Sequence, residues 1–279
     1  MSSKVWIITG CTSGTGLALA EKLLEQGHRV VGTSRDINKF NSLEVSNHDN
    51  FLGLQVDIAN EDSIKQAISK VLERFKTVDV LVNNAGYGLI GAVEETSDIE
   101  NRTMMDALYF GPLNMIRSVL PILREKKSGY IFNVSSVGGI KGFPRRGAYN
   151  GAKFALIGMS EALYEDVKPL GIRVSCLVLG NFKTGFQSSD TLPQQTIDQY
   201  NTQEVRKSFQ QKKTTGFLPG DPKRFADIVI DAEKSQNPPY NIFLGADTFV
   251  VLESKINELQ QQISSQKISN SNVGIPSSE

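Results

Sequence analysis

The stretch "KVWIITGCTSGTG", residues 4–16, decides the fold. It begins with an apolar run rich in β-branched residues, continues with Gly10, Gly14 and Gly16, and opens a helical pattern over 15–26. Glycines let the backbone approach a phosphate closely, and a helix N-terminus offers free N–H donors. The spacing differs from the commoner G-x-G-x-x-G, and glycine turns also join strands to helices without any ligand. The strand–glycine–helix order nevertheless favours a dinucleotide-binding turn.

The same alternation of short apolar runs and longer helical patterns continues along the chain. The runs are continuous, which is typical of parallel strands covered by helices on both faces. The sequence therefore predicts an α/β protein with one doubly wound, Rossmann-type parallel sheet of about seven strands and ligands at the strands' carboxyl ends. Further strands are expected at 29–34, 51–56, 78–83, 129–134, 172–178 and 241–244, and further helices at 61–75, 98–126, 147–168, 221–235 and 247–264.

Composition excludes several classes of protein. Lys+Arg and Asp+Glu both number 30, so neither a nucleic-acid surface nor a membrane surface is indicated. No apolar run approaches the ~20 residues that cross a bilayer, and the N-terminus lacks a signal-peptide pattern. Cys11 and Cys176 cannot form a disulfide framework, which indicates a reducing, cytoplasmic setting. With only His28 and His48, a histidine triad or a metal site is not expected.

The chain shows no repeats and no interdomain linker. We expect one dinucleotide-binding and catalytic domain over 1–264. Residues 185–216 are polar and weakly patterned, and such long insertions are often lids or binding loops, so we expect a substrate loop there. Residues 265–279 are expected to be a disordered tail.

The end of the second expected strand bears on the choice of cofactor. In this fold an acidic side chain here binds the ribose 2′-hydroxyl of NAD, whereas an arginine accommodates the 2′-phosphate of NADP. Ser34 and Arg35 supply a hydroxyl and a fork of donors, which suits a phosphate, although Asp36 lies next to them. NADP(H) is therefore favoured over NAD(H). The alternative is that Arg35 is a solvated loop charge.

Several motifs occur together in one order. They are "TGCTSGTG", "VDI" at 56–58, "NNAG" at 83–86, Ser136 thirteen residues before Tyr149, and Lys153 in "YNGAK". With them the chain resembles the short-chain dehydrogenase/reductase family from about residue 4 to about residue 250. The resemblance implies that Ser136, Tyr149 and Lys153 are catalytic. The pair Tyr164 and Lys168 in "YEDVK" repeats the spacing but has Gly151 in the serine position, so it is predicted to be structural.

The implied chemistry suits these residue types. Hydride addition to a carbonyl creates an alkoxide that needs a proton, and a free tyrosine has a pKa of ~10. A nearby ammonium and an oxidised nicotinamide would favour the phenolate, so Lys153 is expected to lower the pKa of Tyr149. The resemblance also implies that Lys153 binds the nicotinamide ribose and that Ser136 holds the substrate oxygen.

The resemblance further implies a set of cofactor-binding residues. Asp57 and Ile58 would hold the adenine, and Thr184 would cap the carboxamide of the nicotinamide. The whole expected set is Gly10, Thr12, Ser13, Gly14, Thr15, Gly16, Ser34, Arg35, Asp57, Ile58, Asn84, Ala85, Gly86, Tyr149, Lys153, Phe182 and Thr184.

One position departs from the family pattern. Family members commonly carry an asparagine, in a pattern like "N-x-F-G", that helps a water and the lysine relay protons to the tyrosine. Here that position is Leu108, in "MMDALYFGPLN", and leucine can neither donate nor accept a hydrogen bond. Two hypotheses follow: an enzyme that turns over more slowly, or an NADPH-binding sensor or regulator with little activity. An epimerase on the same fold is a third, although the usual signs of a sugar-nucleotide pocket are not evident.

The leading hypothesis is an NADP(H)-dependent carbonyl reductase or alcohol dehydrogenase. Its substrate would be an apolar ketone, aldehyde or secondary alcohol, because Phe143, Phe182, Phe186, Leu89 and Ile90 lie in the segments expected to form the pocket. Two neighbouring arginines, at 145 and 146, are expected to be solvated loop charges, and the alternative is that they bind an anionic substrate. Relatives in the family form dimers or tetramers through the helices expected at 98–126 and 147–168, so a homodimer or homotetramer is expected.

Overall fold

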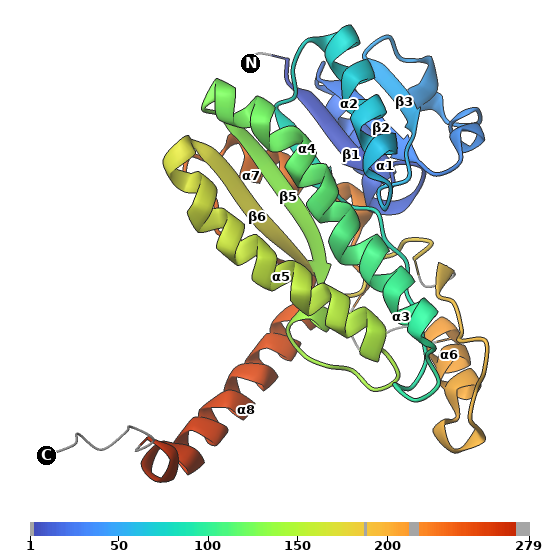
Figure 1. The fold of residues 1–279 in the computed structure, drawn as a ribbon, viewed down its shortest axis with the longest axis vertical. Coiled ribbons are helices and arrows are strands. Elements are labelled where there is room, and N and C mark those ends of the chain that lie inside the picture. Colours follow the sequence, from blue (N-terminus) through green and yellow to red (C-terminus); the bar gives the residue numbers. More distant parts are fainter. Residues whose placement is uncertain (1–2, 187–188, 212–217, 272–279) are drawn as a thin grey trace, which may run out of the picture.

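A seven-stranded parallel sheet organises the chain, and its strand order is β3-β2-β1-β4-β5-β6-β7. The computed structural model describes residues 3–186, 189–211 and 218–271. Every strand pair is parallel, which confirms the predicted doubly wound sheet (Figure 1). The strands are β1 Val5–Thr9, β2 Arg29–Ser34, β3 Phe51–Gln55, β4 Val80–Asn83, β5 Gly129–Ser136, β6 Ile172–Leu179 and β7 Asn241–Leu244.

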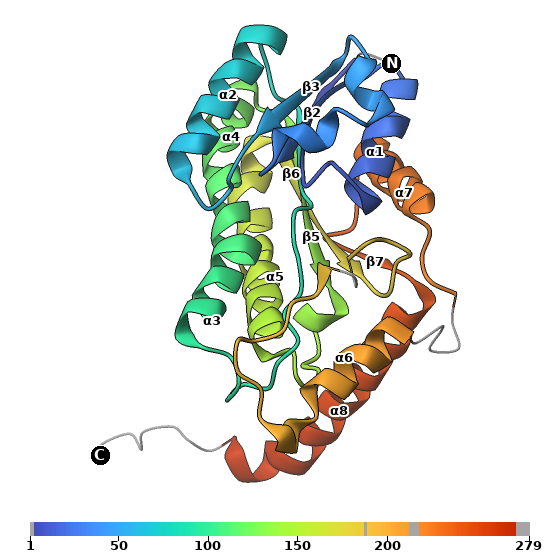
Figure 2. The same ribbon diagram turned by 90° about the vertical axis from the view of Figure 1, so that its right-hand side faces the viewer.

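Helices cover both faces of this sheet. One face carries α1 and α7, which pack against each other, and the other carries α2, α4 and α5 (Figures 1 and 2). Helix α5 leads from the site region along β5 and β6. The helices are α1 Gly14–Glu25, α2 Glu61–Phe75, α3 Asp98–Met105, α4 Gly111–Lys126, α5 Gly147–Val167, α6 Thr202–Gln211, α7 Pro222–Lys234 and α8 Ala246–Asn270.

Strand β1 shows why the apolar runs are continuous. Successive side chains of a strand point to opposite faces. Trp6 and Ile8 belong to the core beneath α1 and α7, whereas Val5 and Ile7 belong to the core beneath α2 and α4. Both faces are buried, so Val5–Ile8 are all apolar, and the polar Thr9 that ends the strand is buried with its hydroxyl hydrogen-bonded.

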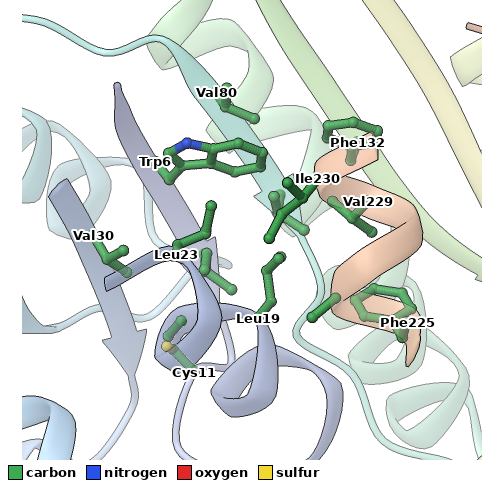
Figure 3. Close-up of a cluster of buried hydrophobic side chains, with 14 of the residues drawn as sticks. Trp6, Cys11, Leu19, Leu23, Val30, Val80, Phe132, Phe225, Val229 and Ile230 are labelled. Atoms are coloured by element: carbon green, nitrogen blue, oxygen red, sulfur yellow. The ribbon is translucent and has the colours of Figure 1, made fainter. Parts of the chain in front are cut away.

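The core beneath α1 and α7 is built around aromatic rings (Figure 3). The rings of Trp6 and Phe132 lie nearly parallel, with centroids 6.4 Å apart. Leu23 of α1 and Val229 of α7 close over them, so the two helices and the strands β1 and β5 share one buried cluster. This packing holds β1 and β5 against α1 and α7.

Three segments differ from the sequence expectations. The single helix expected at 98–126 is α3 and α4 joined by a π-helical segment, Asp106–Phe110. The region 185–216, expected to be a loop, contains α6. Helix α8 extends through Asn270, so residues 265–270 of the predicted disordered tail are helical, while 272–279 lie outside the described residues.

Helix α8 projects away from the sheet (Figure 1). Its first turn stays tied to the site region, because Asp247 accepts a hydrogen bond from the Asn181 N–H at 2.7 Å. Within the described parts of the chain, neither this helix nor any other combines the length and apolar character needed to span a membrane.

Candidate active site and cofactor cleft

The order of the sheet reverses between β1 and β4, and ligands of such sheets bind at this switch point. Here the "NNAG" motif holds the glycine turn in place. The side-chain amide nitrogen of Asn84 donates to the main-chain carbonyls of Thr9, at 3.0 Å, and Gly10, at 3.1 Å. The Thr9 hydroxyl accepts from the N–H groups of Asn84 and Ala85. The glycine turn and the "NNAG" motif are thus one hydrogen-bonded unit.

The glycines of the turn meet steric demands that other residues would not. Gly10 and Gly14 have φ of +66° and +57°, in the left-handed region that favours glycine. A Cβ at Gly16 would lie 2.5 Å from the Gly10 carbonyl oxygen and 2.6 Å from the Asn84 amide nitrogen. Ser13 precedes α1 without capping it by its side chain, which leaves N–H groups of the first turn for another acceptor. The turn therefore fits a phosphate group.

Gly16→Ala is expected to weaken binding of a nicotinamide dinucleotide and to destabilise the fold by about 1–3 kcal/mol, because the added methyl group overpacks the turn. Gly158→Ala is the matched control: it lies in α5, and nothing approaches a Cβ there within 4 Å. We expect that control to leave binding unchanged and to stabilise α5 by about 0.5–1 kcal/mol. Cofactor titration and denaturant unfolding test both; equal affinities for the two variants would contradict the account.

The turn opens into a cleft of about 660 Å³. Of the residues expected to bind the cofactor, Gly16 lines neither this cleft nor the adjoining cavity and instead packs against the Gly10 carbonyl and the Asn84 side chain. Tyr149, Lys153 and Phe182 line the adjoining cavity described below. The rest of the expected set lines the cleft: Gly10, Thr12, Ser13, Gly14, Thr15, Ser34, Arg35, Asp57, Ile58, Asn84, Ala85, Gly86 and Thr184.

One end of the cleft carries two cationic residues. Arg35 and Lys39 both line it, and Lys39 escaped the sequence reasoning although it lies only four residues further along. Asp36 also lines the cleft, but its carboxylate accepts the Asn38 N–H at 3.0 Å and caps a short helical turn. Its charge is therefore partly engaged within its own turn.

A second cavity, of about 270 Å³, adjoins the cleft and brings Ser136, Tyr149 and Lys153 together. Ser136 ends β5, and the other two residues lie one turn apart on α5. The Lys153 ammonium donates to the Val134 carbonyl at 2.8 Å and lies 5.9 Å from the centre of the Tyr149 ring. The Tyr149 and Lys153 side chains are buried, being 7% and 5% exposed.

Burial has the largest effect on the pKa values of Tyr149 and Lys153. It raises the pKa of Tyr149, while a hydrogen bond with Ser136 and the charge of Arg146 act to lower it. Burial also lowers the pKa of Lys153 to about 8. Arg146, which was not expected to act on Tyr149, is thus a cation that lowers the pKa of the phenol, and the expected effect of Lys153 stays a prediction.

Leu108 lies in the π-helical segment and is fully buried. It packs in one apolar cluster with Met104, Tyr149 and Ala152, and its side chain lies 3.0 Å from where a Cβ of Gly86 would be. The position at which the family pattern has an asparagine is therefore occupied by hydrocarbon beside the tyrosine. Single π-helical turns occur frequently at functional sites.

The walls of the second cavity are partly as expected. Phe143, Phe182 and Phe186 line it, and the rings of Tyr149 and Phe186 lie 6.1 Å apart in an edge-on arrangement. Leu89 and Ile90 do not line it, because both are buried in the core. Four further polar residues line it, and the sequence indicated no role for any of them: Ser135, Asn150, Asn181 and Asp247.

The two arginines before α5 are not solvated loop charges. Arg145 donates to the Tyr200 carbonyl. Arg146 pairs with Asp190, and their side chains are 12% and 1% exposed. Tyr164, by contrast, is placed as predicted for a structural residue: it lines neither cavity and packs against Tyr240, with ring centroids 5.5 Å apart.

Comparisons with known proteins agree with this geometry. The family model described as short chain dehydrogenase matches residues 4–195. A protein of Bacteroides thetaiotaomicron named 3-ketodihydrosphingosine reductase is 34% identical over 249 residues, which cover 88% of this chain and 89% of that protein. A solved short-chain dehydrogenase from Streptomyces avermitilis superposes with a TM-score of 0.90 at 31% identity, covering 98% of this chain and 99% of the other.

A second solved structure, a short-chain dehydrogenase/reductase from Burkholderia phymatum, was determined in complex with NAD. It superposes with a TM-score of 0.81 and covers 100% of this chain and 99% of the other. At 24% identity it supports the fold alone. Other solved structures of this fold contain NADP. The matched family model, the relatives above 30% identity and the cleft with its glycine turn lead to one conclusion. The chain is a member of the short-chain dehydrogenase/reductase family of NAD(P)-dependent oxidoreductases.

Proposed function

We propose that this protein is an NADP(H)-dependent carbonyl reductase or alcohol dehydrogenase with Tyr149 as its proton donor and acceptor. The observation that carries the proposal is the junction of the two cavities. The cavity of Ser136, Tyr149 and Lys153 shares Thr15, Asn84, Gly86, Thr184 and Phe186 with the glycine-turn cleft. A cofactor held in the cleft would therefore border the acid–base group.

The proposed reaction gives a different role to each of Ser136, Tyr149 and Lys153. NADP(H), when bound, supplies or accepts the hydride. The Tyr149 phenol donates its proton to the substrate oxygen during reduction and takes it back during oxidation. Ser136 donates a hydrogen bond to the same oxygen, and Lys153, fixed by its bond to the Val134 carbonyl, binds the nicotinamide ribose.

The proposed substrate class follows from the cavity walls. Phe143, Phe182 and Phe186 give an apolar surface around a few polar groups, which suits an apolar ketone, aldehyde or secondary alcohol. A relative at 34% identity is named as a reductase of a 3-keto compound, which agrees with ketone reduction. The preference for NADP(H) is proposed from Arg35 and Lys39 in the cleft, since two cations suit a 2′-phosphate.

A second candidate function is favoured by one observation, the buried Leu108. An NADPH-binding sensor or regulator with little turnover would result if hydrocarbon at this position disables proton supply to Tyr149. We favour the enzyme, because Lys153 keeps its bond to the Val134 carbonyl without an asparagine. Loss of one member of a catalytic unit erodes activity without removing hydride positioning.

Leu108→Asn separates the two candidates when substrate-dependent NADPH consumption is measured over a panel of apolar ketones and aldehydes. We expect turnover in the natural chain and faster turnover, by about tenfold, in the variant, because an amide can support proton transfer. Leu108→Ala is the matched control and is expected to give no gain. Turnover only in the asparagine variant would favour the sensor, and NADPH consumption in neither protein would contradict the reductase.

The oligomeric state and the compartment remain predictions. A homodimer or homotetramer is supported by exposed aromatic side chains on the helices expected to form the interface, Phe110 beside α4 and Phe154 on α5, which are 45% and 44% exposed. Light scattering in solution measures the number of copies. The cytoplasmic location rests on composition alone.

A further inference from the structure

A buried ion pair links the segment after β6 to the start of the catalytic helix α5. The segment is called the flap here and comprises residues 189–207. Arg146 immediately precedes α5, and its guanidinium nitrogens lie 2.7 Å and 3.4 Å from the two carboxylate oxygens of Asp190 in the flap. Two-point contact of this kind fixes both partners in orientation as well as distance.

Neighbouring contacts hold the Asp190 carboxylate in one place. The N–H of Thr191 donates to the Gly88 carbonyl, and the N–H of Ile90 donates to the Thr191 carbonyl, both at 2.9 Å. Arg206 donates to the Asp190 carbonyl, also at 2.9 Å. A Cβ at Gly88 would lie 1.9 Å from an Asp190 carboxylate oxygen, so no other residue fits there without displacing the pair.

A second carboxylate anchors the far part of the flap. Glu95 is buried and accepts hydrogen bonds from the Ile197 N–H at 2.8 Å, from the Thr202 hydroxyl and from the Ala92 N–H. Buried acidic side chains thus hold the flap near its start, at Asp190, and further along, at Ile197 and Thr202. Of the two, only Asp190 is paired with a residue that contacts Tyr149.

That contact has an electrostatic consequence. The Arg146 guanidinium lies 5.7 Å from the centre of the Tyr149 ring, where its charge lowers the pKa of the buried phenol. Asp190 acts in the opposite direction and raises that pKa. The flap therefore brings to the site the charge that offsets Arg146.

We propose that Arg146 and Asp190 are a positioning pair that fixes the flap to α5 and balances the charge beside Tyr149, so that proton transfer by Tyr149 depends on the docked flap. The proposal rests on the proposed function in that Tyr149 is taken as the acid–base residue. It goes further, because it assigns a role to two residues outside the serine, tyrosine and lysine set.

Asp190→Asn tests the pair, with Asp198→Asn as its matched control. The control removes the same charge from an exposed position in the same flap. In the test variant Arg146 acts on Tyr149 without its counter-charge, so the pKa of Tyr149 falls. The pH above which carbonyl reduction declines is then expected to fall by about one unit, with the control unchanged. A slower enzyme with an unshifted pH profile would overturn the proposal, because a purely structural role would give that result.

A double variant distinguishes an effect of charge on the pH profile from an effect of misfolding. Asp190→Asn removes the carboxylate that pairs with the largely buried Arg146, which is destabilising. Arg146→Gln with Asp190→Asn removes both charges and is expected to return the pH profile close to that of the natural chain. A double variant that keeps the shift of the single one would contradict charge balance as the cause.

A readout without turnover separates this proposal from the proposed function. Phenolate formation by Tyr149 is followed by ultraviolet titration, as the difference between each protein and its Tyr149→Phe counterpart. A lower midpoint for Asp190→Asn without any carbonyl reduction would uphold the pair and reject the reductase. Equal midpoints in a protein that does reduce ketones would reject the pair and leave the reductase standing.

Discussion

Tyr149→Phe is expected to lower kcat for carbonyl reduction by about 10²–10⁴-fold, the usual contribution of a positioned proton donor. The substitution removes only the hydroxyl, and the remaining ring keeps its place in the cluster with Leu108 and Ala152. We therefore expect NADPH affinity and the unfolding midpoint to change little. Steady-state rates, cofactor titration and thermal unfolding of the variant measure the three quantities.

The chain offers a matched control in its second tyrosine–lysine pair. Tyr164 also lies on α5 and also precedes a lysine by four residues, but it packs against Tyr240 and lines neither cavity. Tyr164→Phe is expected to leave kcat unchanged. Comparable losses in the two variants would mean that the tyrosines act through stability, and the assignment of Tyr149 would then be wrong.

Arg35→Ala is expected to lower NADPH affinity by about 10–100-fold, the value of one or two hydrogen bonds to a charged group. NADH lacks the 2′-phosphate, so its affinity is expected to stay within about twofold, since an exposed charge contributes little to a neutral ribose. Arg124→Ala, an exposed arginine of α4, is the control. Fluorescence titration with both cofactors measures the difference.

The outcome of the Arg35 experiment decides between two interpretations of the same residue. A loss confined to NADPH would support recognition of the 2′-phosphate. An equal loss for both cofactors would indicate that Arg35 supports the turn itself, and no loss for either would leave it a solvated loop charge. In the second and third cases the NADP(H) preference would have to rest on Lys39 or be abandoned.

Much of the fold could be predicted from local patterns. Strand β1 is apolar from Val5 to Ile8 because both of its faces are covered, and the glycine turn follows Thr9 directly. The same reasoning placed β2 and α2 with their observed bounds. Element order then determined that Ser136 and the start of α5 lie at the same edge of the sheet, because parallel strands end together.

What the sequence did not predict involves contacts between distant segments. Arg146 and Asp190 are separated by 44 positions, and neither belongs to a motif. The π-helical segment Asp106–Phe110 escaped detection because its apolar pattern continues from α3 into α4. Helix α6 was missed for the opposite reason, since its sequence is too polar to show a buried face.

The causes of the pKa shift of Tyr149 could not be predicted from the sequence either. The sequence identified Lys153 as the cation that acts on the phenol, whereas in the folded protein Lys153 is buried and bonded to a carbonyl. Nothing in the sequence indicated that Arg146 also acts on the phenol, or that burial outweighs its charge. Such a balance depends on which groups are desolvated together, and spacing along the chain carries no information about that.

The central claim is hydride transfer from a bound nicotinamide cofactor to a carbonyl carbon with Tyr149 supplying the proton. The most direct measurement uses NADPH in which both hydrogens at the reactive carbon of the nicotinamide are deuterium, an apolar ketone, and mass spectrometry of the product. We predict one deuterium on the carbinol carbon of the alcohol with the natural chain, and almost no product with Tyr149→Phe. An alcohol without deuterium, or equal yields from the two proteins, would contradict the account.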